Sequence, residues 1–262
     1  MELGETILAL WFFAVGAAVG SFLNVCIVRL PRGGSVIRPG SHCPNCKSPI
    51  RFYDNIPMLS YIVLRGKCRG CRAPISPRYF LVEGLSGLMA LALFRNFGLS
   101  PELAVYYVFF SALLVVIFID LDTWTIPDAI TLPGIVAGVA ASFLLPQFDL
   151  WQSLLGLLSG GGVLFLVAVG YQLLRKREGM GGGDIKLLAM IGAFLGLPGV
   201  IYTLFASSLA GSLAGVMIMF RDKSGGSTRI PFGPFLALAA MSYVFWGPTL
   251  VQWYLNSLKG SM

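Results

Sequence analysis

Charged residues are scarce in this sequence, and acidic residues are the scarcer kind. Only 12% of the 262 residues are charged, and just 12 residues are Asp or Glu. Soluble globular domains carry about 25% charged residues. Apolar residues instead make up 56% of the chain, and the mean hydropathy is +0.79. This composition excludes a soluble domain, a disordered chain, a coiled coil and a secreted disulfide scaffold, and it predicts a membrane bundle with a small polar appendage.

Histidine occurs only once, as His42. A Ser-His-Asp or Cys-His catalytic site would have to be built around this single loop residue, which argues against both kinds of site. His42 itself fits either a metal ligand or a solvated loop residue. The net charge of +7 is compatible with nucleic-acid binding, but no helix-turn-helix or aromatic-basic RNA-binding motif accompanies it. The sequence therefore predicts no nucleic-acid partner, and membrane topology explains the basic excess.

Uncharged apolar runs recur along the chain at about the 20-residue length that crosses a bilayer. The longest, residues 187–220, is too long for one helix, and it contains the breaker Leu197-Pro198-Gly199. We expect two helices there, the first beginning near Gly183. The predicted fold is an all-α polytopic membrane protein with about eight transmembrane helices. They cover residues 6–28, 79–94, 103–119, 129–148, 150–174, 187–220 as a pair, and 230–258.

The basic residues predict how these helices are oriented. Eight crossings place four loops on one side, and these loops hold 17 of the 19 Lys and Arg residues. The loops are residues 29–78, 120–128, 175–186 and 221–229. The positive-inside rule makes this side cytoplasmic and leaves both termini on the periplasmic, external side. We expect a first transmembrane helix (1–29), a cytoplasmic loop domain (30–78) and a seven-helix membrane bundle (79–262).

The loop domain contains two C-x2-C turns, Cys43-Pro-Asn-Cys46 and Cys68-Arg-Gly-Cys71, with 21 residues between them. Each turn can direct two thiolates at one ion, and four thiolates complete the tetrahedral site that suits Zn²⁺. Disulfides are the alternative, but a cytoplasmic loop lies in a reducing compartment. We therefore predict a structural zinc site with Cys43, Cys46, Cys68 and Cys71 as ligands. The fifth cysteine, Cys26, lies in the first apolar run and is expected to pack there.

Two aspartates lie beside apolar runs, where a carboxylate is energetically costly and therefore indicates a function. Asp120 ends one run, and Asp184 follows Gly181-Gly182-Gly183 and precedes another. The predicted topology places both at the cytoplasmic edge of the membrane. Two neighbouring carboxylates share a proton, so one can take a proton from water while the other polarises a peptide carbonyl. This is the chemistry of an aspartic protease, and the glycine run would let a peptide substrate approach closely.

Other interpretations of the acidic residues are open at this point. Asp122 could exchange roles with Asp120, and Asp184 could cap the helix that begins beside it. Asp128 directly precedes an apolar run, which favours an N-cap. Glu83, near the start of the second run, fits a cap, an interfacial acid or part of a second site. For the whole protein, membrane acids also suit a transporter, and a zinc loop suits a docking module anchored by the bundle.

Short motifs follow one another in order along nearly the whole chain, from Gly20 to about Ala240. They are Gly20-Ser-Phe-Leu-Asn-Val25, Arg29-Leu-Pro-Arg-Gly33, the C-x2-C turns around Asp54-Asn-Ile-Pro57, Ile126-Pro-Asp128, Gly181-Gly-Gly-Asp184-Ile-Lys186 and Ile230-Pro-Phe-Gly-Pro234. Each motif alone is weak. The ordered set resembles the bacterial type IV prepilin peptidases, membrane aspartic proteases of the GxGD type.

The resemblance implies an enzyme that removes the short leader of prepilins or pseudopilins after a glycine, at the cytoplasmic face of the bacterial inner membrane. It also implies that the new N-terminal residue is then N-methylated from S-adenosylmethionine. Asp184 matches the aspartate of the GxGD motif, and Asp120 matches the first catalytic aspartate. Gly181, Gly182 and Gly183 match the active-site loop. The cysteine loop matches the family's zinc-binding region, which is associated with methyl transfer. No residue is assigned to S-adenosylmethionine, since the sequence has no glycine-rich nucleotide-binding turn.

Overall fold

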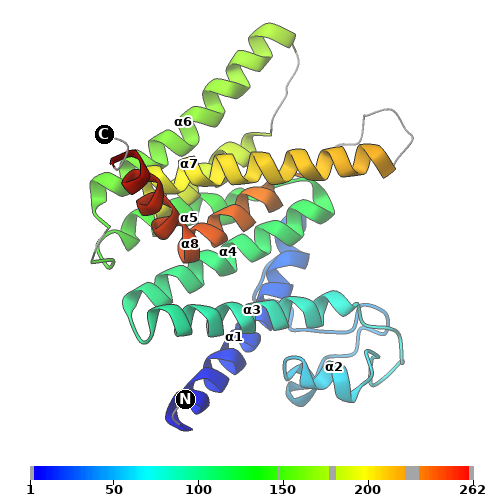
Figure 1. The fold of residues 1–262 in the computed structure, drawn as a ribbon. Coiled ribbons are helices and arrows are strands. Elements are labelled where there is room, and N and C mark those ends of the chain that lie inside the picture. The colour runs from blue at the N-terminus through cyan, green and yellow to red at the C-terminus, as the bar shows by residue number, and fades with distance from the viewer. Residues whose placement is uncertain (1–2, 147, 177–180, 222–229, 260–262) are drawn as a thin grey trace. The chain divides into compact units, whose positions relative to one another are not determined.

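A computed structural model describes the chain except for residues 1–2, 147, 177–180, 222–229 and 260–262 (Figure 1). Helices make up nearly all of its regular structure. They are α1 (Leu3–Arg29), η1 (Leu30–Arg32), η2 (Phe52–Asn55), α2 (Leu59–Val63), α3 (Pro77–Phe97), α4 (Pro101–Thr123), α5 (Asp128–Ala141), α6 (Leu150–Arg175), α7 (Gly182–Arg221) and α8 (Gly233–Lys259). Among the described residues, β-pairing is limited to two isolated bridges in the loop domain.

Six of the described helices are long and apolar enough to cross a membrane: α1, α3, α4, α6, α7 and α8. Helix α5 is apolar but has 14 residues, about 21 Å, which is shorter than the ~30 Å hydrocarbon core. The predicted helical membrane class is therefore confirmed. The described residues therefore give six candidate spans where eight crossings are expected: the crossing expected at 129–148 is the shorter α5, and the pair expected at 187–220 is the single broken helix α7.

The break in α7 lies beside the predicted breaker. Gly196 has a φ of 69° and a ψ of −175°, a conformation that residues with a Cβ atom rarely adopt. Pro198 has no N–H to donate to a preceding carbonyl, and its ring crowds the preceding turn. One helical segment ends and another begins at these residues, so the long apolar run forms two helical segments, as predicted.

The chain divides into two compact units, Met1–Val115 and Val116–Met262, with the boundary inside α4. The first unit contains α1, the loop domain, α3 and most of α4. The second contains the last turns of α4 and helices α5 to α8. Each predicted site therefore lies within a single unit, the cysteines in the first and the aspartate pair in the second.

In the first unit, α1 packs closely along α3 because small residues line the contact. A Cβ atom added to Gly16 would lie 2.6 Å from the Cβ of Ala90, and one added to Gly20 would lie 2.7 Å from the Cα of Glu83. The Ser86 hydroxyl donates a hydrogen bond to the Gly16 carbonyl at 2.7 Å. The glycines within these spans therefore serve helix packing.

In the second unit, α7 is central and packs against α5, α6 and α8. Its side chains fill much of the buried core, including Leu187, Leu188, Met190 and Ile191. Glycines again bring two backbones together: a Cβ atom on Gly156 of α6 would lie 2.1 Å from the carbonyl oxygen of Gly192 of α7. This tight packing holds the first turn of α7, with Asp184, in place.

Candidate functional site

Asp120 lies in the last turn of α4 and is buried, with 5% of its surface exposed. Its Oδ2 atom accepts a hydrogen bond of 3.1 Å from the backbone N–H of Gly233, the first residue of α8. The first N–H groups of a helix lack partners within the helix and carry partial positive charge. The carboxylate of Asp120 therefore satisfies one of these donors and is stabilised by it.

Gly233 is required by the closeness of this contact. A Cβ atom at this position would lie 2.6 Å from Asp120 Oδ2 and 3.1 Å from the Cδ1 atom of Ile126. Any larger residue would push the carboxylate away from the start of α8. In the sequence, the motif Ile230–Pro234 stands out only through the family resemblance. The contact with Asp120 supplies the physical reason for its glycine.

Asp184 lies in the first turn of α7 and is half-buried. Its backbone N–H donates to the Gly181 carbonyl at 3.2 Å. A Cβ atom on Gly183 would lie 2.9 Å from the Cβ of Ile126, whereas one on Gly182 would meet nothing within 4 Å. Gly183 is therefore needed for packing, and Gly182 leaves open space beside Asp184.

The structure brings Asp120 and Asp184 close enough to interact electrostatically. Ile126 lies against both Gly183 and Gly233, so the end of α4 and the starts of α7 and α8 meet around it. Interacting carboxyl groups titrate as a pair rather than singly. The arrangement can therefore provide one proton acceptor and one proton donor at the same place.

The neighbouring acidic residues have different surroundings. Asp122, the alternative to Asp120, is exposed. Asp128 is the first residue of α5, the N-cap position is Pro127, and no side chain makes a capping bond there. The predicted capping role of Asp128 is therefore wrong. Both of its carboxylate oxygens instead accept from Lys186 Nζ at 2.7 Å, because the first turns of α7 bring that positive charge beside the start of α5.

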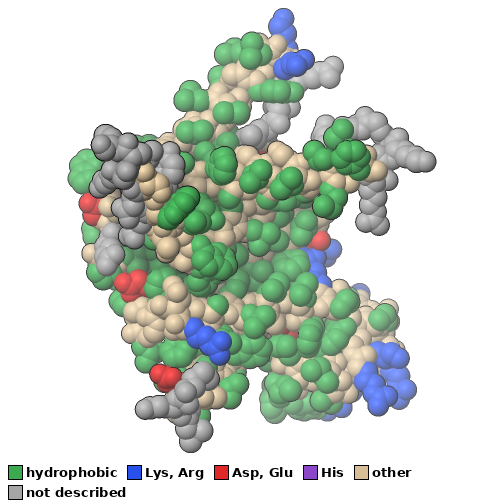
Figure 2. Space-filling view, viewed as in Figure 1, with side chains coloured by type: hydrophobic (Ala, Val, Ile, Leu, Met, Phe, Trp, Pro, Cys, Tyr) green, Lys and Arg blue, Asp and Glu red, His purple; other side chains and the backbone are tan. Residues whose placement is uncertain are grey.

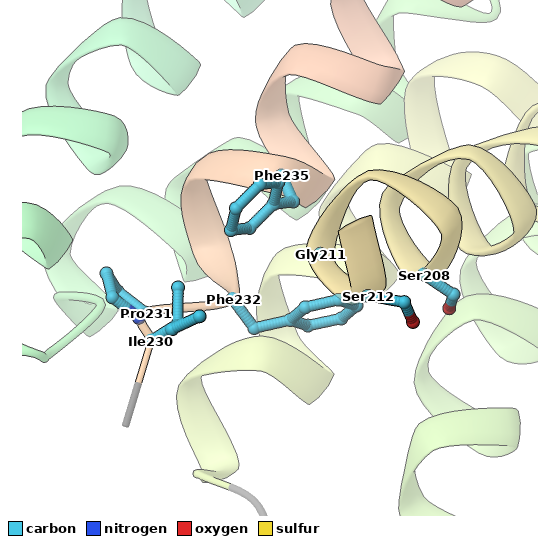
Figure 3. Close-up of a pocket in the computed structure, with 7 residues that line it drawn as sticks. All are labelled: Ser208, Gly211, Ser212, Ile230, Pro231, Phe232 and Phe235. Carbon is cyan, nitrogen blue, oxygen red and sulfur yellow. The ribbon is translucent and has the colours of Figure 1, made fainter. Parts of the chain in front are cut away.

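A cavity of 330 Å³ lies between the second segment of α7 and the start of α8 (Figure 3). Its lining is mainly apolar and aromatic, with two hydroxyl groups: Ser208, Gly211, Ser212, Ile230, Pro231, Phe232 and Phe235. Phe232 directly precedes Gly233, whose N–H binds Asp120. The cavity is therefore joined to the carboxylate pair through the backbone at the start of α8.

The four predicted cysteine ligands form a cluster in the loop domain. Their Sγ atoms all lie within 4.8 Å of one another. The Cys43 and Cys71 sulfurs are 3.8 Å apart, and those of Cys46 and Cys68 are 4.0 Å apart. Four thiolates at 2.3 Å from a tetrahedral Zn²⁺ ion would be about 3.8 Å apart. The cluster could therefore hold a metal ion, and its spacing suits zinc.

The two cysteine turns are copies of each other, displaced by 25 residues. In each turn the first cysteine donates its N–H to a carbonyl five residues later, and the residue after the second cysteine has a positive φ. The hydrogen bonds are Cys43 to Ser48 and Cys68 to Ala73, and the positive φ values are 56° at Lys47 and 58° at Arg72. The repeat Cys-x-x-Cys-Lys/Arg-x-Pro-Ile in residues 43–50 and 68–75 is a sequence signal that would have predicted this symmetry.

Hydrogen bonds within the turns favour the thiolate form of two of the cysteines. The hydroxyl and backbone of Ser48 lower the pKa of Cys46 to about 6. The backbone N–H groups of Cys71 and Gly70 lower the pKa of Cys68. A thiolate is the form that binds metal ions. These two positions therefore favour metal binding at neutral pH.

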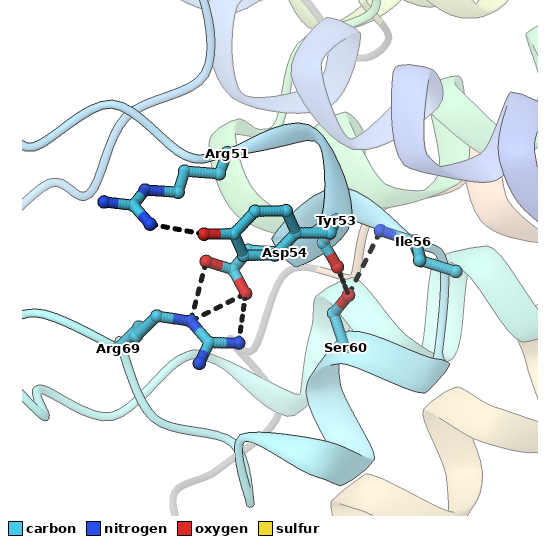
Figure 4. A network of polar contacts seen from close by, with 6 residues as sticks. All are labelled: Arg51, Tyr53, Asp54, Ile56, Ser60 and Arg69. Atoms are coloured by element: carbon cyan, nitrogen blue, oxygen red, sulfur yellow. Dashed lines mark hydrogen bonds and ion pairs between the residues drawn. The ribbon is translucent and has the colours of Figure 1, made fainter.

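The motif Asp54–Pro57 connects the helical part of the loop domain to the second cysteine turn (Figure 4). The Asp54 carboxylate accepts hydrogen bonds from Arg69, with a shortest N–O distance of 2.6 Å. The Arg69 guanidinium also lies 5.5 Å from the centre of the Tyr53 ring. The Ser60 hydroxyl donates to the Tyr53 carbonyl at 3.0 Å. These contacts join η2, α2 and the cysteine cluster into one module.

The remaining residues singled out in the sequence have the following surroundings. His42 donates from Nδ1 to the Gly40 carbonyl at 2.9 Å and lies outside the four-sulfur cluster. Cys26 is a free thiol in α1. Glu83 is buried and accepts a 2.7 Å hydrogen bond from the Met58 N–H. Glu83 does not cap α3, because Ser76 makes the capping bond.

Two family models match this chain. Residues 14–97 match the model of the bacterial peptidase A24 N-terminal domain, and residues 107–216 match that of the type IV leader peptidase family. No solved structure matches the chain.

Similar curated proteins are named prepilin leader peptidase/N-methyltransferase. The Aeromonas hydrophila protein is 36% identical, and the match covers 98% of both chains. The Stutzerimonas stutzeri protein is 35% identical, and the match covers 92% of both chains. The Myxococcus xanthus protein is 41% identical over 83% of this chain but only 65% of its own length. With two family models and full-length relatives in agreement, this chain belongs to the type IV leader peptidase family.

Proposed function

We propose that this protein removes the leader peptide of type IV prepilins or pseudopilins after a glycine and then N-methylates the new N-terminal residue. The observation that carries the proposal is the meeting of Asp120 and Asp184 at the ends of apolar helices. Membership of the family and the names of its full-length relatives support both activities.

In the proposed peptidase reaction, the ionised carboxyl group of the pair takes a proton from a water molecule. The water oxygen attacks the scissile carbonyl carbon while the protonated carboxyl group donates a hydrogen bond to the carbonyl oxygen. The tetrahedral intermediate then collapses, the C–N bond breaks, and the leaving amine receives a proton. The N–H of Gly233 orients Asp120, and the open space at Gly182 leaves room for an extended peptide beside Asp184.

The cavity beside the start of α8 is the proposed place for part of the substrate. Its aromatic lining, with Phe232 and Phe235, suits an apolar segment of a prepilin. It adjoins the residue that binds Asp120, so a peptide held there would have its backbone close to the carboxylate pair. This position supports a peptide substrate over a small solute, and it favours the peptidase over a transporter.

We also propose that Cys43, Cys46, Cys68 and Cys71 hold Zn²⁺ in a closed structural site, in which the ion orders the loop domain. S-adenosylmethionine is the proposed methyl donor; when bound, it would supply an activated methyl group for the new α-amino group. The expected division into a first helix (1–29), a zinc loop (30–78) and a membrane bundle (79–262) remains part of this proposal.

The chain is a multi-pass inner-membrane protein of this family. We propose that the zinc loop and the aspartate pair face the cytoplasm and that both termini face the periplasm. The concentration of Lys and Arg in residues 29–78 and 175–186 supports this orientation.

The test of the proposed peptidase uses purified protein in detergent and a prepilin substrate. Asp120→Asn and Asp184→Asn keep the shape of each side chain and remove its charge, and each should reduce leader cleavage by about 10³-fold or more. Asp122→Asn is the matched control on the same turn and should cleave normally. Normal cleavage by both dyad variants, or its loss only in the Asp122 variant, would overturn the assignment.

A further inference from the structure

The short helix α2 directs an apolar face outward. Leu59, Ile62 and Val63 are 61%, 59% and 73% exposed. Residues at positions i, i+3 and i+4 lie on one face of a helix. The opposite face carries Tyr61, whose ring lies 5.5 Å from that of Phe80. The usual arrangement of a helix on a water-soluble surface is therefore reversed.

Contacts with α3 set the level at which α2 lies. The Met58 N–H, just before α2, donates to Glu83 at 2.7 Å. The end of the Met58 side chain lies beside Gly84, 3.7 Å from where a Cβ atom would be. Since α3 begins at Pro77, these contacts and the Tyr61–Phe80 pair lie about 5 to 10 Å along that helix. Helix α2 therefore lies beside the first two turns of a membrane-spanning helix.

In a membrane crossed by α3, this level would correspond to the boundary between lipid headgroups and acyl chains. Helices that lie in this boundary bury their apolar face about 5 to 10 Å into it. Exposure of Leu59, Ile62 and Val63 to water would be unfavourable, because all three side chains are apolar. At this depth acyl chains would cover them. The exposed face and its level along α3 both indicate lipid contact.

The charge of the loop domain complements an anionic membrane surface. Residues 29–78 contain ten Lys or Arg residues and a single acid, Asp54, which pairs with Arg69. Arg65 and Lys67 follow directly after α2 and are exposed. In Figure 2, hydrophobic side chains gather over α2 with basic side chains on the same module. Basic residues beside an inserted apolar face bind the negative headgroups of the cytoplasmic leaflet.

We propose that α2 is an interfacial membrane anchor for the cysteine module. Leu59, Ile62 and Val63 insert into the cytoplasmic leaflet, and Arg65 and Lys67 bind anionic headgroups. Because Met58 and Tyr61 attach α2 to α3, the anchor fixes the cysteine module at the membrane surface. The proposal depends on α3 crossing the membrane and does not depend on the peptidase reaction.

The test uses the full chain in nanodiscs of phosphatidylglycerol and phosphatidylethanolamine. A fluorescent amino acid replaces Ile62 in one variant and Arg72, an exposed residue of the second cysteine turn, in the control. Lipids with brominated acyl chains quench fluorophores that contact them. The probe at position 62 should lose about half of its emission or more, and the probe at position 72 should lose about a tenth or less.

A second measurement separates insertion from folding. Ile62→Asp places a charge on the inserted face and should speed hydrogen exchange of the α2 amides by about tenfold or more. Ile62→Leu is the matched control and should leave exchange unchanged, as should the amides in the middle of α3 in both variants. Replacing phosphatidylglycerol by a zwitterionic lipid should weaken the protection of α2 in the wild type but not in an Arg65→Gln/Lys67→Gln variant.

The proposal is overturned if the two probe positions are quenched equally. It is also overturned if position 62 becomes protected only after a prepilin is added, since the face would then bind the substrate. A protein that loses leader cleavage while its α2 amides stay protected from hydrogen exchange would count against the proposed function. The same result would support the membrane anchor.

Discussion

The cysteine cluster and the aspartate pair are assembled over very different distances along the chain. The cysteines furthest apart are 28 positions from each other, and each turn is closed by its own backbone hydrogen bonds. Asp120 and its partner Gly233 are 113 positions apart and belong to different helices. The first site is thus a local structure that could hold an ion, whereas the second exists only when three helix ends are packed together. Damage to one site should leave the other intact.

Among the changes that test this independence of the two sites, the largest effect is expected from Gly233→Ala. The added Cβ atom would lie 2.6 Å from Asp120 Oδ2 and would displace that carboxylate, so leader cleavage should fall by about 10²-fold. Gly215→Ala is the control, because its Cβ atom would meet only Ile230 Cδ1 at an ordinary 3.9 Å. Metal content should remain normal in both variants. Loss of metal in Gly233→Ala would show that the two sites are not independent.

Cys46→Ser tests the independence of the two sites by a change in the cysteine cluster. Removal of one thiolate from a four-sulfur site should reduce bound zinc from one ion per chain to about a tenth or less, measured by metal analysis. Methylation should fall more than cleavage, and cleavage should fall by less than about tenfold. Absence of zinc from the wild-type protein would refute the metal assignment, and equal losses of both activities would contradict the separation.

Ser212→Trp is expected to have a moderate effect confined to substrate binding. The indole would fill the cavity beside Phe232, so KM for a prepilin should rise about five- to tenfold while kcat changes little. Leu213→Trp is the matched control, since Leu213 is 61% exposed and does not line the cavity. A fall in kcat at unchanged KM would mean that the cavity acts on the carboxylate pair and not on the substrate.

The smallest effect is expected from Asp54→Asn in the cysteine module. Hydrogen bonds from Arg69 hold the pKa of the Asp54 carboxyl group below its ordinary value. The stabilisation is therefore present above the pKa of the unfolded chain and is lost as the pH falls below about 4. Hydrogen exchange near η2 should rise by less than about fivefold in the variant at pH 7. The difference from wild type should shrink as the pH falls below about 4, and a difference that stayed constant would point to a cause other than this ion pair.

The cysteine cluster could be predicted almost completely from the sequence. The spacing of Cys43, Cys46, Cys68 and Cys71 identifies all four members, because each C-x2-C turn is a local structure. The fold class and the break near Pro198 could also be predicted, since both follow from composition and from backbone chemistry. The 25-residue repeat of the turns was present in the sequence as a signal.

The aspartate pair could be predicted only in part. Asp120 and Asp184 stand out because carboxylates are rare beside apolar runs. The role of Gly233 could not be derived, because the sequence around α8 does not indicate that a residue of α4 packs against this glycine. The same limit explains the wrong N-cap at Asp128, whose partner Lys186 lies 58 positions away. The outward face of α2 was also missed, because a five-residue helix is too short for a clear periodicity.

The hydrogen bond between Gly233 and Asp120 can form only late in the synthesis of the chain, because Gly233 begins the last helix. Both aspartates leave the ribosome before α8, so the nascent chain carries the two carboxyl groups in the membrane without the N–H that orients one of them. Asp120 gains this partner only when the last helix is inserted. A chain truncated ahead of residue 233 should therefore cleave no leader peptide, because its Asp120 lacks this partner.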